Sequence, residues 1–219
     1  MKILLLHAHP EPKSFTSALK DTAVDFFTKR GDEVIVSDLY QMNFNPVGVQ
    51  SDFKSRANTE YFSYLKEQMN AHINNLFVDD LKAEMEKLKW ADFLLINTPL
   101  WWSTFPAILK GWFDRVLALG FAYHPREKLY ENGVFRGKKA MLSLTAGASE
   151  QAYTEQGANG DIMKVLFHIH HGILYYIGMD VLPPFIAWRA HLEPRETLEK
   201  YIENYKQYLS NIEKLKPLF

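Results

Sequence analysis

The strongest constraint on the fold is an alternation of short, wholly apolar runs with longer segments of helical spacing. Five runs have the pattern of strands buried on both faces, at residues 2–6, 33–37, 93–97, 140–144 and 179–182. Segments whose apolar residues recur at helical spacing lie between or after these runs, at 15–30, 79–90, 107–117 and 196–215. This alternation predicts an α/β protein whose parallel sheet is covered by helices on both faces.

Connections between parallel strands are right-handed, and this rule restricts the strand order. The spacing fits a flavodoxin-like, doubly wound five-stranded parallel sheet of order 2-1-3-4-5, in a single domain over residues 1–219. Ser14 is expected to cap the first helix and Gly31 to end it. Residues 43–75 form a polar segment longer than a usual connection. We expect this segment to contain a helix over 60–73 and to cover a sheet edge or a partner subunit.

Charge and composition exclude several classes of protein. The 25 Lys and Arg residues balance 26 Asp and Glu residues, and a net charge of −1 argues against a nucleic-acid partner. Because the chain has no cysteine, disulfides, thiolate metal sites and cysteine nucleophiles are excluded, and redox chemistry requires a bound organic cofactor. No apolar stretch approaches the ~18–20 residues of a membrane span, and the N-terminal run ends at His7, which is too short for a signal peptide. We therefore expect a cytoplasmic protein without an integral membrane segment.

The loops that follow strands 1, 3 and 4 are the expected place for a ligand, because open α/β sheets bind ligands beyond the carboxyl ends of their strands. The first loop carries His9, Ser14, Phe15 and Thr16 and lacks the glycine patterns of dinucleotide and P-loop sites. It nevertheless ends at a helix N-terminus, where free N–H groups and the helix dipole attract a phosphate. The alternative is that Ser14 serves only as an N-cap.

The other two loops differ from each other in character. The loop after strand 3 is rich in rings and consists of Pro99, Leu100, Trp101, Trp102, Ser103, Thr104 and Phe105. A planar ligand would use such rings, although either tryptophan could instead pack under the loop or in a dimer interface. The loop after strand 4 is made of small residues, Thr145, Ala146, Gly147 and Ala148, whose backbone N–H groups can approach a ligand closely.

The histidines do not form a metal-binding pattern. His168, His170 and His171 crowd one segment, but no carboxylate or thiol stands at a matching position. We expect no metal site there, and we expect His7 to be a satisfied core or dimer residue at the end of strand 1.

Two long blocks are specific enough to identify relatives. The block Pro106-Ala-Ile-Leu-Lys-Gly-Trp-Phe113, the block Met42-Asn-Phe-Asn-Pro46 and the triplet Phe121-Ala-Tyr123 resemble the NAD(P)H:quinone oxidoreductase (DT-diaphorase) family of the flavodoxin-like superfamily. The similarity runs in order from Lys2 to about Glu199 and so covers most of the chain.

The resemblance implies a homodimer with active sites at the subunit interface. Each site would hold a flavin, FAD with FMN possible, pass a hydride from NAD(P)H through flavin N5 to a quinone, and work by a ping-pong mechanism. FAD is favoured because residues 43–75 match the animal-type insertion in length.

The resemblance also implies roles for particular residues. The flavin would contact His9, Ser14, Phe15, Thr16, Pro99, Leu100, Trp101, Trp102, Ser103, Thr145, Ala146, Gly147, Ala148 and Tyr153. The substrate would contact Trp102, Phe105, Gly147, Ala148 and Tyr123, the last supplied by the partner subunit. Tyr153 and Asn159 would form the catalytic pair.

The sequence departs from the family pattern at some of these positions. Asn159 stands where the family usually has a histidine, and an amide donates a hydrogen bond but carries no proton. Ser103 stands where the animal enzymes have a phenylalanine, and Pro125 where they have a second tyrosine, so the range of acceptors is expected to differ. One relative holds a metal through a His-x-x-x-His pair, and Tyr175 takes the second position here.

Other functions remain open at the level of sequence. One is a flavodoxin-type electron carrier, although such carriers are usually strongly acidic and this chain is not. A second is an ancillary flavoprotein of a potassium-efflux transporter. A third keeps the enzyme but changes the acceptor to an azo or nitro compound.

Overall fold

The sheet has the predicted order. In a computed structural model that describes all residues from Met1 to Phe219, the strands run β2-β1-β3-β4-β5 and every pairing is parallel. The four long strands are β1 (Lys2–His7), β2 (Glu33–Asp38), β3 (Phe93–Pro99) and β4 (Lys139–Ala146). β1 and β3 occupy the middle of the sheet, and their apolar side chains are buried on both faces, as the continuous apolar runs predict.

The last position of the sheet differs from the prediction, because two short strands share it. β5 (Asp180–Val181) pairs with the beginning of β4 and β6 (Phe185–Trp188) pairs with its end, so the sheet has six strands instead of five. Pro183 and Pro184 lie between the two. Proline has no N–H to donate to a ladder, which explains the interruption and why the predicted strand stopped at residue 182.

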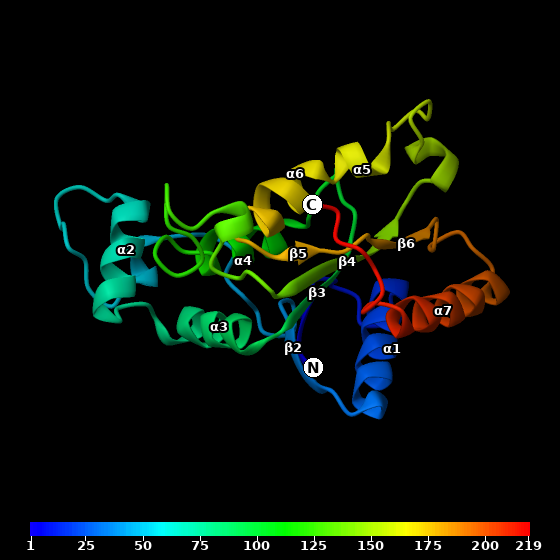
Figure 1. The fold of residues 1–219 in the computed structure, drawn as a ribbon, viewed down its shortest axis with the longest axis horizontal. Helices are drawn as coiled ribbons and strands as arrows, with labels where there is room; N and C mark the ends of the chain where they lie inside the picture. Colours follow the sequence, from blue (N-terminus) through cyan, green and yellow to red (C-terminus); the bar gives the residue numbers. More distant parts are fainter.

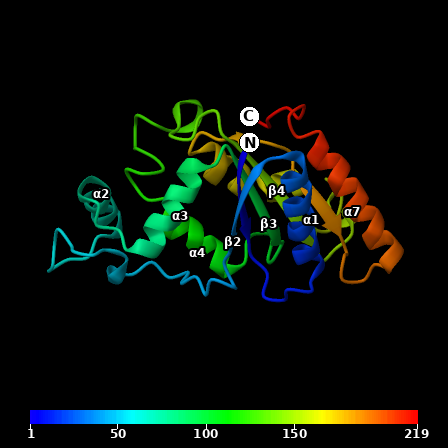
Figure 2. The same ribbon diagram turned by 90° about the horizontal axis from the view of Figure 1, so that it is seen from below.

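Helices cover the sheet in two layers, as Figures 1 and 2 show. α1 (Phe15–Arg30) and α7 (Arg195–Ser210) lie together on one face, whereas α3 (Asp79–Trp90) and α4 (Ala107–Val116) lie on the other. α7 ends at Ser210 instead of residue 215, because the chain turns at Asn211, whose N–H donates to the Tyr208 carbonyl at 3.1 Å. None of the helices is both long and apolar enough to cross a membrane.

The two ends of α1 are formed as predicted. The Ser14 side chain accepts a hydrogen bond from Ser17 N–H at 3.1 Å. Gly31 adopts φ 89° and donates its N–H to the carbonyls of Phe27 and Thr28. Glycine suits this left-handed position because it has no Cβ.

The segment between β2 and α3 forms an arm at one end of the molecule (Figure 1). Its helix, α2 (Tyr64–Asn74), begins four residues later than predicted. A buried cluster fixes the arm to α4: Arg115 forms an ion pair with Asp52 at 2.8 Å and donates to the Asn45 carbonyl at 2.6 Å. The Tyr64 hydroxyl also donates to Asp52, at 2.6 Å.

The remaining helical elements are short. They are η1 (Gln50–Asp52), η2 (Tyr130–Asn132), η3 (Glu150–Tyr153), α5 (Ile162–Val165), α6 (Phe167–Ile169) and the π-helical turn η4 (His170–Tyr175).

Candidate functional site

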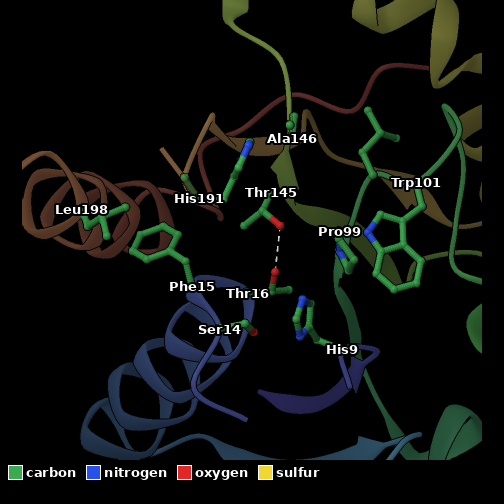
Figure 3. A pocket seen from close by; sticks show the side chains of 13 residues that line it. His9, Ser14, Phe15, Thr16, Pro99, Trp101, Thr145, Ala146, His191 and Leu198 are labelled. Carbon is green, nitrogen blue, oxygen red and sulfur yellow. Dashed lines mark hydrogen bonds between the residues drawn. The ribbon is translucent and has the colours of Figure 1, made fainter. Parts of the chain in front are cut away.

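A cavity of about 490 Å³ opens at the carboxyl ends of β1, β3 and β4, where the strand order predicts a ligand (Figure 3). It brings together ten of the residues predicted to contact a flavin. These are His9, Ser14, Phe15, Thr16, Pro99, Leu100, Trp101, Thr145, Ala146 and Gly147. Three segments far apart in the sequence therefore meet at one site.

A hydrogen bond joins two of these segments in the middle of the cavity. Thr16 Oγ1 and Thr145 Oγ1 lie 2.7 Å apart, and Figure 3 shows the two hydroxyls pointing toward each other. Thr16 belongs to the first turn of α1, whose N–H groups have no partner within the helix. These groups and the helix dipole make this part of the cavity favourable for an anion. Ser14 caps the helix and lines the cavity as well, so the two interpretations of this serine are compatible.

A buried polar row lies beneath the first turn of α1. His7 Nδ1 donates to Asn97 Oδ1 at 2.7 Å, and Asn97 Nδ2 donates to Ser143 Oγ at 3.3 Å. His7 Nε2 lies 3.3 Å from Ser17 Oγ, which donates to the Glu11 carbonyl at 2.9 Å. Burial lowers the pKa of the His7 imidazole, so the ring is neutral near pH 7. The prediction of a satisfied core histidine is confirmed, and its partners hold the loop beside the cavity.

The loop after β3 presents its tryptophans to the solvent. Trp101 lines the cavity and approaches His9 edge-on, with ring centroids 6.4 Å apart. Trp102 is 99% exposed, so the alternative that it packs under the loop does not hold. Trp102 and Ser103 both have positive φ, at 51° and 59°, which is strained for residues other than glycine. Trp101 and Thr104 exchange two backbone hydrogen bonds of 3.0 Å and close this strained turn.

Several predicted site residues lie away from this cavity within the single chain. Phe105 is 5% exposed and stacks on Phe113 in the core, with centroids 5.3 Å apart, because the loop turns inward toward α4. The structure thus does not place Phe105 at the cavity. Trp102, Ser103 and Ala148 are also outside its lining.

The tyrosines predicted to act in catalysis and substrate binding pack elsewhere. Tyr153 stacks on Trp188 with centroids 5.4 Å apart, and the Asn159 N–H donates to the Ala152 carbonyl at 2.8 Å. Tyr123 packs against Tyr176 and lines a separate, smaller hollow. Burial, with Tyr176 as a second cause, raises the pKa of Tyr123. None of these three side chains lines the cavity of its own chain.

Three lining residues were missed by the sequence analysis: Ala190, His191 and Leu198. They follow β6, whereas the last strand predicted from the sequence ends before the two prolines. Had the strand been extended through Pro183 and Pro184 to Trp188, the loop after it would have been expected at the same sheet edge.

The cavity has two different ends. Figure 3 shows Trp101 and His9 at one end, Phe15 and Leu198 at the other, and the paired threonines between them. Such a lining can receive a flat group at Trp101, an anion at α1 and a second apolar group near Leu198. The structure contains no cluster of three His, Cys, Asp or Glu side chains that could hold a metal ion.

Comparisons with known proteins agree with this geometry. Residues 1–209 match the family described as having a flavodoxin-like fold. The chain is 38% identical to ribosyldihydronicotinamide dehydrogenase [quinone] of Homo sapiens, covering 99% of this chain and 94% of the relative. It is also 38% identical to NAD(P)H dehydrogenase [quinone] 1 of Rattus norvegicus, covering 100% and 80%.

The chain is also similar in structure to solved quinone reductases. A crystal structure assigned as a quinone reductase from Klebsiella pneumoniae superposes with a TM-score of 0.96 at 38% identity, covering 100% of this chain and 87% of the other. The NAD(P)H:quinone oxidoreductase of Methanothermobacter marburgensis superposes with a TM-score of 0.76 at 27% identity, covering 96% of each chain.

Proposed function

The chain belongs to the flavodoxin-like family and, within it, to the NAD(P)H quinone dehydrogenases; from this premise we propose that it reduces quinones with NAD(P)H by means of a flavin bound in the cavity. When bound, the flavin supplies a hydride-accepting N5 atom, so that donor and acceptor react in turn by a ping-pong mechanism. The observation that carries the proposal is the single cavity in which three ligand-binding loops of the sheet converge.

The cavity fits a phosphate-bearing flat cofactor by its own geometry. The first turn of α1 offers N–H groups, and the hydroxyls of Ser14 and Thr16 lie beside them. A Cβ built on Gly147 would meet only His191, at 3.9 Å, so the backbone here is open to a ligand. We assign the Gly147 N–H group as a hydrogen-bond donor toward the cofactor, which favours the arrival of negative charge. The Ala148 N–H group and the Tyr153 phenol do not line the cavity of this chain, and we propose that they act as further donors only in the completed site.

We propose FAD as the flavin. The end of the cavity formed by Phe15, His191 and Leu198 provides room for an adenosine beyond the phosphate-binding turn. The length of segment 43–75, which first suggested FAD, gives no support within one chain, because no residue of that arm lines the cavity. Heating the purified protein and identifying the released chromophore by chromatography tests the assignment. FAD is expected, FMN would limit the site to a mononucleotide, and a colourless protein that takes up neither flavin would overturn the function.

We further propose that the protein is a homodimer whose partner completes the site. Trp102 is 99% exposed and directly follows Trp101, which lines the cavity. The arm exposes several large apolar side chains, namely Val47, Tyr61, Leu65 and Ile73. Exposed apolar groups of this size on one segment favour an interface. A partner subunit at the rim would also account for three predicted site residues that do not line the cavity of their own chain, namely Trp102, Tyr123 and Tyr153.

Steady-state turnover tests the reaction itself. The relatives differ in the donor that their names give, so NADH, NADPH and ribosyldihydronicotinamide should each be assayed with a soluble quinone. Oxidation of at least one donor, dependent on the quinone and on bound flavin, is expected. Absence of turnover with all three in the flavin-loaded protein would leave an electron carrier or a transporter subunit as the better function.

A further inference from the structure

A second cavity, of about 520 Å³, lies toward the amino end of β4. The cavity proposed to bind the flavin, called the flavin cavity below, lies at the carboxyl ends of the strands. Lys138, which immediately precedes β4, lines the second cavity, whereas Thr145 and Ala146 at the end of β4 line the flavin cavity. The walls of the second cavity come from the end of α2, from α3 and from the loops on either side of Gly120 and Phe135. α2 and α3 lie at the same end of the molecule in both views (Figures 1 and 2). We call this second cavity the lysine cavity.

The floor of the lysine cavity is apolar and rigid. Phe77, Met85 and Phe135 are each at most 6% exposed and belong to the main hydrophobic core. Gly120 has φ +92°, and a Cβ built on it would lie 2.8 Å from the His72 ring, so this wall is tightly closed. Small-molecule sites are of this kind: preformed, mostly apolar and lined by aromatic rings.

The polar lining carries mainly positive charge. Lys82, Lys89 and Lys138 face a single carboxylate, Glu86. Neighbouring lysines are used in ion pairs, Lys54 with Asp79 and Lys87 with Glu84, but Lys82 and Lys89 have no such partner. A cleft with one sign of charge and low-dielectric walls concentrates ions of the opposite sign.

Helix stability does not account for all of these lysines. Lys138 Nζ donates to the carbonyls of Lys89 and Ala91 and so caps the end of α3, and burial lowers the pKa of this amine. Lys89 also lies in the last turn, where a cation is favourable. Lys82, however, lies near the beginning of α3, where the helix dipole disfavours a cation. It interacts with Asp79 on the same helix, whose pKa it helps to lower, but it forms no ion pair and lines the cavity.

We propose that the lysine cavity is a second small-molecule site that binds a planar aromatic anion, with its rings on Phe77 and Phe135 and its anionic group between Lys82 and Lys89. The site is independent of the flavin cavity, and binding there does not require the reductase activity. A neutral ring compound leaves the three lysines opposed by the Glu86 carboxylate alone, so the site selects the anion.

Calorimetric titration of the flavin-loaded protein with 2-naphthalenesulfonate tests the site. One site per chain is expected, with affinity that falls as salt rises because the lysines are partly exposed. The double variant Lys82→Ala/Lys89→Ala is expected to bind roughly three- to tenfold more weakly, the effect of two partly screened charges. The variant Lys214→Ala/Lys216→Ala removes two exposed lysines elsewhere and is expected to bind as the unmodified protein does.

A second variant tests the apolar part of the site. Val134 is 37% exposed at the cavity, and Val134→Trp fills the space without removing a charge. Loss of binding with unchanged melting temperature and unchanged flavin absorbance is expected. The proposal is wrong if the sulfonate does not bind at millimolar concentration, or if NADPH or added flavin displaces it. It is also wrong if Lys82→Ala/Lys89→Ala and Val134→Trp both bind the sulfonate as tightly as the unmodified protein does.

Discussion

At the scale of single residues, the contact between Thr16 and Thr145 is the most direct link between the fold and the proposed cofactor site. It joins the first turn of α1 to the end of β4, and Thr16 is only 2% exposed. Thr16→Val keeps the shape of the side chain but leaves the Thr145 hydroxyl without its partner. We expect a loss of about 1 kcal/mol in the free energy of unfolding and roughly tenfold weaker flavin binding.

Urea unfolding and flavin fluorescence titration measure the two effects of this change. Thr154→Val is the matched control, because that hydroxyl donates to the Gln151 carbonyl in an exposed turn. Unchanged flavin affinity in Thr16→Val would remove Thr16 from the proposed site.

His170 makes the stability of the protein sensitive to acid. Its side chain is 1% exposed, its Nε2 has no hydrogen-bond partner, and burial, assisted by nearby His168, lowers the pKa to about 4. Between pH 6.5 and 4 the unfolded chain therefore binds a proton at this residue that the folded chain does not. The contribution of neutral His170 to the free energy of unfolding should be fully present above pH 6.5. The free energy of unfolding should then fall by roughly 3 kcal/mol as the pH drops to 4.

The comparison of His170→Leu with the unmodified protein isolates this contribution. Urea unfolding at a series of pH values should give a shallower decline for the variant, while the decline from His7, whose pKa burial also lowers, stays in both. Parallel curves for the two proteins would show that His170 is not the group responsible.

At the scale of elements, the predictions that are confirmed are mostly those that depend on a short stretch of sequence. The apolar runs of β1 and β3, the cap at Ser14 and the stop at Gly31 each depend on a few adjacent residues, and each is found as predicted. β6 was missed because Pro183 and Pro184 interrupt the pattern, although the strand resumes its pairing with β4 after them. The inward turn that buries Phe105 against Phe113 depends on a tertiary contact, which no local pattern records.

The N-terminus of α1 allows its structural and ligand-binding roles to be separated. Ser14→Ala removes the cap on Ser17 N–H and should cost about 0.5–2 kcal/mol of stability. Ser14→Asp keeps a capping oxygen, and an acidic side chain at this end is favourable to the helix dipole, so stability should return. The same carboxylate repels a phosphate at the cavity, and flavin binding should weaken further than in Ser14→Ala.

Thermal melts of the flavin-free proteins and flavin titrations together test this reversal of order. Stability should rank Ser14→Asp above Ser14→Ala, and flavin affinity should rank the opposite way. Equal flavin affinity in the two variants would place the phosphate away from the helix N-terminus.

At the scale of the whole molecule, ten of the residues that the sequence predicted to contact a flavin lie in one cavity, whereas other predicted site residues lie outside it. Trp102 and Tyr123 were predicted to meet the substrate, yet one is exposed to solvent and the other packs against Tyr176. Periodicity and loop position predict how one chain folds. They therefore predict which residues line the cavity of that chain, but not which residues a second chain would add to it. The proposed dimer is what connects these residues to the site.

The arm is the segment on which the dimer can be tested without altering the cavity. Ile73 on α2 is 70% exposed and Tyr61 before α2 is 72% exposed, and neither lines the flavin cavity. The double variant Tyr61→Glu/Ile73→Glu places two charges on this surface and should dissociate the proposed dimer, because burying unpaired carboxylates is costly. The arm itself should stay attached through the buried ion pair between Arg115 and Asp52.

Sedimentation equilibrium and steady-state kinetics on the same samples decide the outcome. The unmodified protein should sediment as a dimer at micromolar concentration and the arm variant as a monomer, with quinone turnover reduced at least tenfold. Val36→Glu on the edge strand β2, where Val36 is 37% exposed, controls for a charge on another apolar position and should remain dimeric and active. A monomeric variant with full turnover would mean that each chain completes its own site, and Tyr123 would then have no role in substrate binding.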